Sequence, residues 1–355
     1  MVNGQSSNSF MSRTVVIAIL IIVSVLLSTL SFYAWQIFKT PNLQVGENDK
    51  DFELFIPRGA TFETVMDSLN AHQVVNDKMS FRFLARFMKY NENVKNGRYI
   101  IKKKMSNQEA IRKLRSGAQD PMKLTFNNIR LKDELITKLG AKFEFGPNAL
   151  DSLLKDPTVC AHYGFDTTTI MCMFLPNTYE FFWTTSADNF LDRMGKEYKK
   201  FWTPERQQKA KAMGLTQTQV QTLASIVESE SKANDEKPRV AGVYWNRLQK
   251  GMLLEADPTL VFALRDFTIR RVLNVHKQID SPYNTYKYKG LPPGPINLPT
   301  LSSIDAVLNH ENHDYLYFVA RPDFSGHHTF AKTYDEHMNN ARMYHAELNK
   351  RGIMK

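Results

Sequence analysis

The chain has 355 residues, of which 43% are apolar and 23% charged, a balance that excludes a disordered or low-complexity protein and allows two compact domains. Two cysteines in this length exclude a scaffold held together by disulfides. Lysine and arginine number 46 against 36 aspartate and glutamate, which gives a formal net charge of +10. This excess favours acidic partners such as anionic polymers, lipid headgroups or nucleic acid, without selecting one of them.

The N-terminal part of the chain contains a long apolar segment. Residues 14–38 include no charged side chain, and their 25 positions would extend about 37 Å as a helix, more than the roughly 30 Å of a hydrocarbon core. A cleaved signal peptide has a shorter apolar region, and a buried core helix is rarely this long. The sequence predicts one transmembrane helix, with Tyr33 and Trp35 at its outer interface and a cytoplasmic tail over residues 1–13. The bulk of the chain is expected on the extracytoplasmic side of the inner membrane.

A polar stretch over residues 39–50 contains proline and glycine and predicts a linker. The next segment, 51–120, predicts a small subdomain in the order strand, helix, helix, strand, followed by a third helix. Its expected elements are a strand at 52–57, helices at 61–70 and 78–89, a strand at 97–101 and a helix at 106–115 that ends at Gly117. This βααβ order and the stretch IPRGATFETVMDSL resemble the LysM-like module of cell-wall proteins.

The remainder of the chain, 121–355, contains both expected strands and expected helices. Expected strands are 122–126 and 316–320, and expected helices are 131–140, 204–215, 216–231 and 334–349. Cys160 and Cys172 are interpreted as either one disulfide or two buried small hydrophobic residues.

Two glutamates in the helix expected over 216–231 are the first candidates for chemistry. At about 100° per residue, Glu228 and Glu230 fall on opposite borders of the apolar stripe that runs from Val220 to Val227. A half-desolvated carboxyl has a raised pKa and can hold a proton near neutral pH, as a general acid must. The alternative is that both are solvated glutamates on a helix surface.

Several motifs in this region occur together in one known family. The segments LASIVESES (223–231), VYWNRL (243–248) and MLLEADPT (252–259) are followed by SPYNTY (281–286), GLPPGPI (290–296) and GHHTF (326–330). In this order they closely resemble the membrane-bound endolytic murein transglycosylases, the MltG or YceG-like family. The resemblance implies an α+β fold with one N-terminal transmembrane helix, the small LysM-like subdomain and a larger mixed α+β catalytic domain.

The resemblance also implies a reaction. It is the cleavage of the bond between N-acetylmuramic acid and N-acetylglucosamine inside peptidoglycan glycan strands, leaving 1,6-anhydro ends. Glu228 maps to the catalytic glutamate, acting first as acid and then as base, and Glu230 maps to a supporting position; Ser229 stands where many relatives have lysine. One carboxyl suffices because the sugar's own hydroxyl, rather than water, attacks. The peptidoglycan synthesis machinery is implied as a further partner.

The same motifs supply candidates for substrate contact. Several of them have a structural alternative: Asp257 as a helix cap, Arg247 as a surface ion pair, the tyrosines as interface or core residues and His328 as a satisfied structural histidine. The expected substrate-binding residues are Glu230, Asn246, Arg247, Asp257, Tyr283, Asn284, Thr285, Tyr286 and His328. The sequence contains neither HExxH nor CxxC nor a glycine-rich phosphate loop, so we expect no metal and no cofactor.

Two other functions remain open from the residues. A hydrolytic muramidase would use Asp257 or Glu230 as its second carboxylate. A non-enzymatic, membrane-anchored peptidoglycan-binding protein would use the small subdomain to hold glycan. Nucleic acid is disfavoured as a partner because the anchor would place the basic domain on the opposite side of the membrane.

Overall fold

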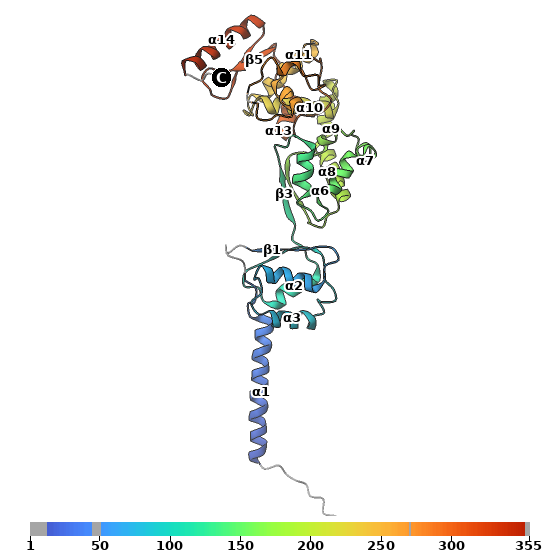
Figure 1. Ribbon diagram of the computed structural model, residues 1–355, viewed down its shortest axis with the longest axis vertical. Helices are drawn as coiled ribbons and strands as arrows, with labels where there is room; N and C mark the ends of the chain where they lie inside the picture. Colours follow the sequence, from blue (N-terminus) through green and yellow to red (C-terminus); the bar gives the residue numbers. More distant parts are fainter. Residues whose placement is uncertain (1–12, 45–50, 270, 352–355) are drawn as a thin grey trace, which may run out of the picture. The chain divides into compact units, whose positions relative to one another are not determined.

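The computed structural model of the protein describes residues 13–44, 51–269 and 271–351. The chain divides into two compact units, which Figure 1 colours along the sequence. Unit 1 ends at Met122 and also includes Phe182–Thr184, and unit 2 contains Lys123–Phe181 and the residues from Thr185 onward. Helices and short two-stranded sheets alternate, so the prediction of a mixed α+β fold is confirmed. The predicted tail, except Arg13, and residues 45–50 of the predicted linker lie outside the described residues.

Unit 1 begins with the long helix α1 (Arg13–Lys39), which is long and apolar enough to cross a membrane. Its side chains are exposed as far as Gln36, whereas Ile37 and Phe38 pack against the core of unit 1. The side-chain amide of Asn107 donates a hydrogen bond of 3.1 Å to the backbone carbonyl of Ile37. The helix therefore continues without a break into the folded part of unit 1.

The rest of unit 1 confirms the predicted order of strand, helix, helix, strand and third helix; its likeness to LysM modules stays a prediction. Thr61 and Ser106 each form a capping box at a helix start, and Gly117 ends the third helix with φ of +74°, a conformation that favours glycine. The strands β1 and β2 pair antiparallel, with Leu54 opposite Tyr99. The elements are β1 (Phe52–Ile56), α2 (Phe62–Ala71), α3 (Lys78–Phe87), β2 (Gly97–Ile101) and α4 (Asn107–Ser116).

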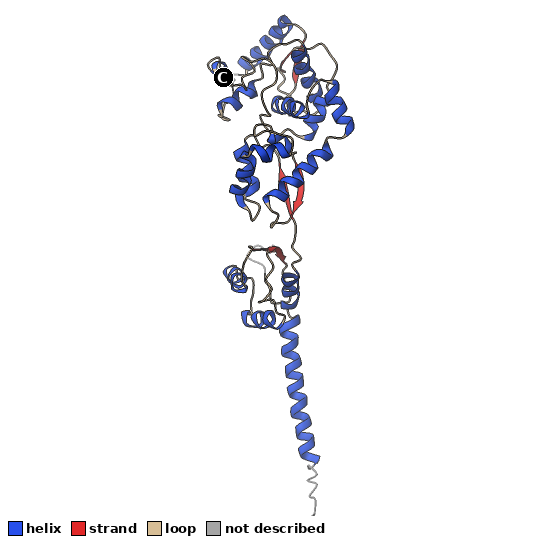
Figure 2. Cartoon of the chain, turned by 90° about the vertical axis from the view of Figure 1, so that its right-hand side faces the viewer, coloured by secondary structure: helices blue, strands red, loops and turns tan. Residues whose placement is uncertain are grey.

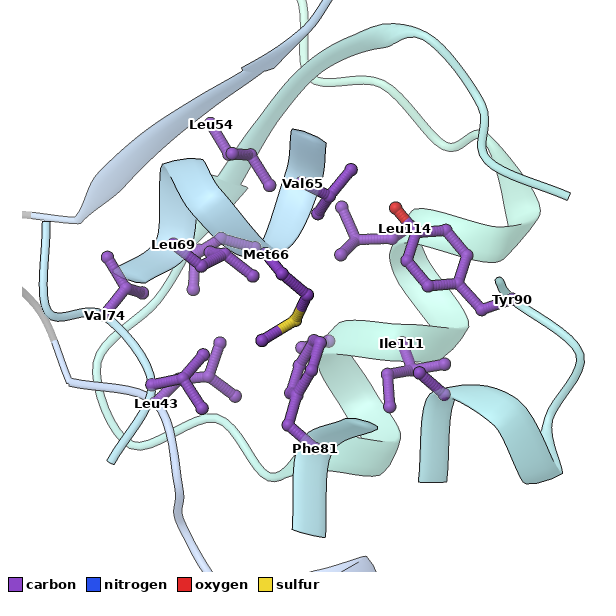
Figure 3. Packing of buried hydrophobic residues seen from close by; sticks show 14 of the residues in the cluster. Leu43, Leu54, Val65, Met66, Leu69, Val74, Phe81, Tyr90, Ile111 and Leu114 are labelled. Carbon is purple, nitrogen blue, oxygen red and sulfur yellow. The ribbon is translucent and has the colours of Figure 1, made fainter. Parts of the chain in front are cut away.

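The core of unit 1 lies between these helices and the strand pair. Met66 and Phe81 are fully buried at its centre, with Leu43 beside them (Figure 3). Leu43 belongs to the polar stretch predicted as a linker, and its neighbour Asn42 donates hydrogen bonds to Asn107 Oδ1 at 2.7 Å and to the carbonyl of Asp77 at 2.9 Å. Over its described part this stretch is thus packed into the unit rather than being a free tether.

Unit 2 starts with a strand pair and a group of helices around an aromatic core. The ring of Phe190 lies 5.1 Å from that of Phe143 and 5.3 Å from that of Phe181. Cys160 and Cys172 are both buried and both free, so they are two small apolar residues and not a disulfide. The elements are β3 (Met122–Phe126), α5 (Lys132–Gly140), α6 (Gly146–Lys155), α7 (Pro157–His162), the 3-10 turn η1 (Ile170–Met173), β4 (Asn177–Phe181) and α8 (Ala187–Phe201).

The remainder of unit 2 is built around α10, which packs against α11, α12 and α13. The predicted helix over 204–215 ends earlier, because Gly214 adopts a left-handed φ of +69°. Figure 2 shows the predominance of helices here. The elements are α9 (Pro204–Ala212), α10 (Gln217–Glu230), α11 (Lys237–Gln249), α12 (Asp257–Leu264), the 3-10 turn η2 (His276–Gln278), α13 (Leu301–Leu308), β5 (Tyr317–Ala320), β6 (His328–Ala331) and α14 (Tyr334–Lys350).

The proline-rich segment 290–297 fastens α10 in place. The backbone N–H of Ile296 donates to the Ser225 hydroxyl at 3.0 Å. The side-chain amide of Asn297 donates to the Ser225 carbonyl at 3.0 Å and to the Ser229 hydroxyl at 2.7 Å. All side chains of α10 from Val220 to Val227 are buried, so the helix presents polar side chains to solvent or to cavities only at its two ends.

Candidate active site

The carboxylate of Glu228 is held by three side chains. Its Oε2 lies 3.0 Å from the ammonium of Lys237 and accepts hydrogen bonds from the hydroxyl of Thr300 at 2.5 Å and from that of Ser303. Burial raises the pKa of Glu228, but the bonds from Ser303, Thr300 and Lys237 together outweigh burial and lower this pKa below its ordinary value. The prediction of a raised pKa is therefore wrong for Glu228, because its donors stabilise the ionised form.

Glu230, the last residue of α10, has the opposite environment. Burial raises the pKa of its carboxyl to about 7, the charge of Asp257 acts in the same direction, and a hydrogen bond from Tyr244 opposes them. That bond joins the Tyr244 hydroxyl to Glu230 Oε1 at 2.7 Å. The predicted raised pKa is confirmed for Glu230, which can hold a proton near neutral pH.

Two cavities of unit 2 meet these glutamates. The larger cavity, of about 590 Å³, is lined by residues that include Glu228, Glu230, Asp257, Asn297 and Thr300. The smaller cavity, of about 360 Å³, is lined by residues that include Glu230, Arg247, Asp257, Tyr286 and Tyr317. Glu230 and Asp257 line both, so the carboxyl with the raised pKa stands between two spaces rather than at the end of one.

Four of the nine predicted contact residues line the smaller cavity: Glu230, Arg247, Asp257 and Tyr286. Asp257 is the first residue of α12 rather than its cap, since Ala256 occupies the cap position, and its Oδ1 accepts a hydrogen bond of 2.5 Å from Tyr286. Arg247 is buried and donates to the carbonyl of Leu254 at 2.7 Å and to Glu255 at 2.8 Å. Asp257 and Tyr286 thus present polar groups to the cavity, while the bonds of Arg247 also fix its wall.

The other five predicted contact residues line neither cavity, and the structure gives them roles within the fold. The amide of Asn246 donates to the carbonyls of His313 and Tyr315. The amide of Asn284 donates to the carbonyls of Lys277 and Ile279, and the hydroxyl of Thr285 accepts a hydrogen bond from the N–H of Ala256. The Tyr283 ring packs on Phe262, and His328 Nδ1 lies 2.7 Å from buried Glu236.

Four residues at the larger cavity and its border were missed by reasoning from the sequence: Lys237, Asn297, Thr300 and Ser303. Lys237 is only 3% exposed although lysine is normally a surface residue. Thr300 and Ser303 lie more than 70 positions after the glutamate that they bind. The only local signal was Thr300 before an apolar run, which predicts a helix cap and not a partner for Glu228.

The described residues contain no group of three or more histidine, cysteine, aspartate or glutamate side chains placed to hold a metal ion. The polar groups at the site include the carboxyls of Glu230, Glu228 and Asp257, the ammonium of Lys237, the amide of Asn297 and several hydroxyls. Such a set can donate a proton, accept it back and stabilise positive charge on a sugar ring.

Comparison with known proteins gives a consistent result. The endolytic murein transglycosylase of Bacillus subtilis is 28% identical over 312 residues, covering 83% of this chain and 85% of the relative. That of Streptococcus pneumoniae serotype 2 is 27% identical over 349 residues, and the match spans 87% of this chain but 61% of the relative's length. The crystal structure of a YceG-like protein of Listeria monocytogenes aligns with a TM-score of 0.55 and 26% identity, over 82% of this chain and 98% of that one.

The family model described as "YceG-like family" matches residues 54–343. This range takes in most of unit 1 after α1 and nearly all of unit 2, including the two glutamates, both cavities and the segment 290–297. The chain therefore belongs to the YceG-like family.

Proposed function

We propose that this protein is an endolytic lytic transglycosylase that cleaves glycan strands of peptidoglycan, with Glu230 as the proton donor. The observation that carries the proposal is the position of Glu230, whose pKa is raised to about 7 and which lines both cavities. The relatives' name, endolytic murein transglycosylase, supports the same reaction.

The two glutamates have environments that favour different protonation states. Paired carboxyl groups with separated pKa values commonly divide the acid role from the role of a charged stabiliser. Glu230 is the member that is half protonated near pH 7, while the donors around Glu228 favour its ionised form. The resemblance gives the acid role to Glu228; we assign it to Glu230, which lines both cavities and has the raised pKa.

The reaction then proceeds without an attacking water. The protonated carboxyl of Glu230 gives its proton to the glycosidic oxygen as the bond to C1 of N-acetylmuramic acid breaks. The resulting carboxylate takes the proton of the C6 hydroxyl of the same sugar, and that oxygen forms the new bond to C1. The carboxylates of Glu228 and Asp257 line the same space and stabilise positive charge that develops on the ring.

We also propose that α1 is a membrane anchor that stays on the mature protein, with both units on the extracytoplasmic side where peptidoglycan lies. Removal of a signal sequence at its C-terminal end would take Ile37 and Phe38 from the core of unit 1. A truncated protein that begins at Lys39 would lose the same contacts. The full chain in detergent is therefore the proper material for assays.

Mass spectrometry of the products tests the proposed reaction and its acid. The full chain is incubated with purified peptidoglycan, in parallel with Glu230→Gln and Glu228→Gln. We expect 1,6-anhydro ends from the wild type, none from Glu230→Gln, and a reduced yield from Glu228→Gln. Glu205→Gln is the matched control, because Glu205 is 75% exposed and pairs only across the surface with Lys209.

Each other outcome identifies another function or another acid. Reducing ends in place of anhydro ends would establish a hydrolytic muramidase, for which Asp257 at the same two cavities provides a second carboxylate. Full activity in Glu230→Gln together with its loss in well-folded Glu228→Gln would return the acid role to Glu228. Retention on insoluble peptidoglycan without any released product would indicate a binding protein.

A further inference from the structure

The helix α3 has an exposed apolar stripe. Its buried face consists of Phe81, Leu84 and Ala85, which pack in the core of unit 1. On another face, Met79, Phe83 and Phe87 are 82%, 56% and 68% exposed. These three lie at intervals of four residues and so share one side of the helix. Large apolar side chains gathered in this way mark an interaction surface rather than scattered exposure.

The stripe lies beside the end of α1. The ring of Phe87 is 5.9 Å from the ring of Phe38, which belongs to the last turn of α1. Figures 1 and 2 both show α3 at the side of unit 1 that α1 enters. On α1 itself, Tyr33 and Trp35 are 57% and 66% exposed just before the packed turn. The apolar surface of α1 thus continues onto α3.

Basic residues border the stripe on one side. At about 100° per residue, Arg86 and Lys78 fall on the side of the stripe next to Met79, and Lys89 follows two residues after the end of the helix. All three basic residues are exposed. An amphipathic helix with aromatic and apolar residues beside a basic edge is typical of a segment that lies in the plane of a membrane interface.

We propose that α3 is an interfacial helix that seats unit 1 on the bilayer, with Met79, Phe83 and Phe87 inserted at the boundary between headgroups and acyl chains. The occupant of the surface is a lipid bilayer that contains anionic lipid, attracted by the basic edge. The inference rests on the proposed role of α1 as an anchor. Because α1 is continuous with unit 1, that anchor holds α3 at the depth where the bilayer ends.

This arrangement also assigns a function to the small unit. Its face near α1 is occupied by lipid, so any contact with glycan would have to use another face. A protein partner is the other class of occupant for an apolar stripe. The bilayer is favoured because the stripe adjoins the exposed surface of a helix that is itself apolar enough to span a membrane.

A fluorescence experiment on the full chain tests the proposal. The two native cysteines are buried and free, so a single introduced cysteine can carry a thiol-reactive environment-sensitive dye. Met79→Cys and Phe83→Cys place the dye in the stripe. Phe55→Cys is the matched control, because Phe55 is also an exposed apolar residue, at 42%, but belongs to β1, which both figures show on the side of unit 1 away from α1.

The labelled proteins are reconstituted into vesicles of phosphatidylcholine and phosphatidylglycerol that contain a nitroxide-labelled lipid. We expect blue-shifted emission at positions 79 and 83, with quenching roughly twofold or more above that at position 55. Equal quenching at all three positions, in protein that floats with the vesicles, would overturn the role of α3 and leave the anchor standing. A blue shift without quenching would show a protein surface over the stripe and overturn the bilayer as occupant. Protein that fails to float with the vesicles would refute the anchor and, with it, the seating of α3.

Discussion

The hydroxyl of Tyr244 donates a hydrogen bond of 2.7 Å to Oε1 of Glu230. Burial raises the pKa of Tyr244 well above its ordinary value, so the phenol remains protonated and keeps donating across the neutral range. This bond stabilises the charged form of Glu230 and opposes the larger effect of burial on the same carboxyl. The hydrogen bond from Tyr244 therefore lowers the pKa that burial raises, and so lowers the pH up to which Glu230 holds its proton.

The pH dependence of the reaction follows from this pair. Glu230 must be protonated to act as an acid, so we expect kcat/KM to fall as pH rises through about 7. Tyr244→Phe removes a donor to the carboxylate and should move the alkaline limb upward by about one pH unit. The measurement is a pH profile of product release, with Tyr288→Phe as control because Tyr288 bonds to the exposed Asp280. A limb that stays in place, or moves to lower pH, would contradict the role of Tyr244.

Stability provides a check on Glu230 that does not depend on activity. A carboxyl whose pKa is higher in the folded state than in the unfolded state costs stability as pH rises between the two values. From about pH 5 to about pH 8, the wild type should lose stability relative to Glu230→Gln, which does not titrate. Thermal unfolding of both proteins across this range measures the difference. A constant offset would show that the pKa of Glu230 is not raised.

Glu228 should behave in the opposite way. Its folded-state pKa is lowered, so its contribution to stability is present above the ordinary carboxyl pKa and is lost as pH falls through the folded value. Near neutral pH we expect Glu228→Gln to cost about 2 kcal/mol of the free energy of unfolding, because Lys237 then stays buried without its counter-charge. Adding Lys237→Met should recover part of this loss in a double-mutant cycle by chemical denaturation. A strictly additive double mutant would show that the two side chains are not coupled.

A substitution at Arg247 can show whether this residue stabilises the fold or binds the substrate. Its guanidinium donates hydrogen bonds to the Leu254 carbonyl and to Glu255, and it lies 5.1 Å from the centre of the Tyr317 ring. The planar group thus makes three separate contacts. Arg247→Lys should cost about 2 kcal/mol of stability, since one ammonium cannot replace these contacts. Arg193→Lys is the matched control, because Arg193 is 50% exposed and makes one pair with Glu197. If unfolding is unchanged while KM rises, Arg247 acts on the substrate instead of on the fold.

The two buried cysteines should not react with thiol reagents in the folded protein. Cys160 and Cys172 are 0% and 1% exposed, and burial raises the pKa of both thiols, so few thiolates form in the folded protein. A maleimide reagent should therefore modify neither residue until a denaturant is added, as read by intact mass. Glu205→Cys, at a position that is 75% exposed, should react at once under the same conditions. Modification of the native wild type would show that unit 2 opens readily.

Much of the secondary structure was predictable because its signals are local. The capping residues Thr61, Ser106 and Thr216 start helices where the sequence places them, and the apolar spacing of α2 and α10 is correct. The packing of residues 41–43 was not predictable. Asn42 and Leu43 belong to a polar stretch, and only the partners supplied from other segments bury them.

The candidate site was predictable only in part for the same reason. The helical periodicity placed Glu228 and Glu230 at the borders of one apolar stripe, and it predicted the same half-buried environment and raised pKa for both. What distinguishes them comes from distant positions: Lys237 and two hydroxyls near residue 300 for Glu228, and Tyr244 with Asp257 for Glu230. A charge pattern along one helix cannot show which neighbouring helix supplies a donor.

Thr300 stands at the cap position of α13, yet its hydroxyl makes no cap bond to that helix and is turned to Glu228. The backbone N–H of Thr300 also points to Glu228 Oε2, at 3.4 Å. The Glu228 carboxylate of α10 thus accepts hydrogen bonds from the cap residue of α13, where the positive end of the helix dipole also favours a negative charge. Replacing Glu228 would therefore remove a charge and also free the start of α13 from its contact with α10. Inactivity after such an exchange has two equally good explanations, which only a fold-sensitive measurement on the same sample can separate.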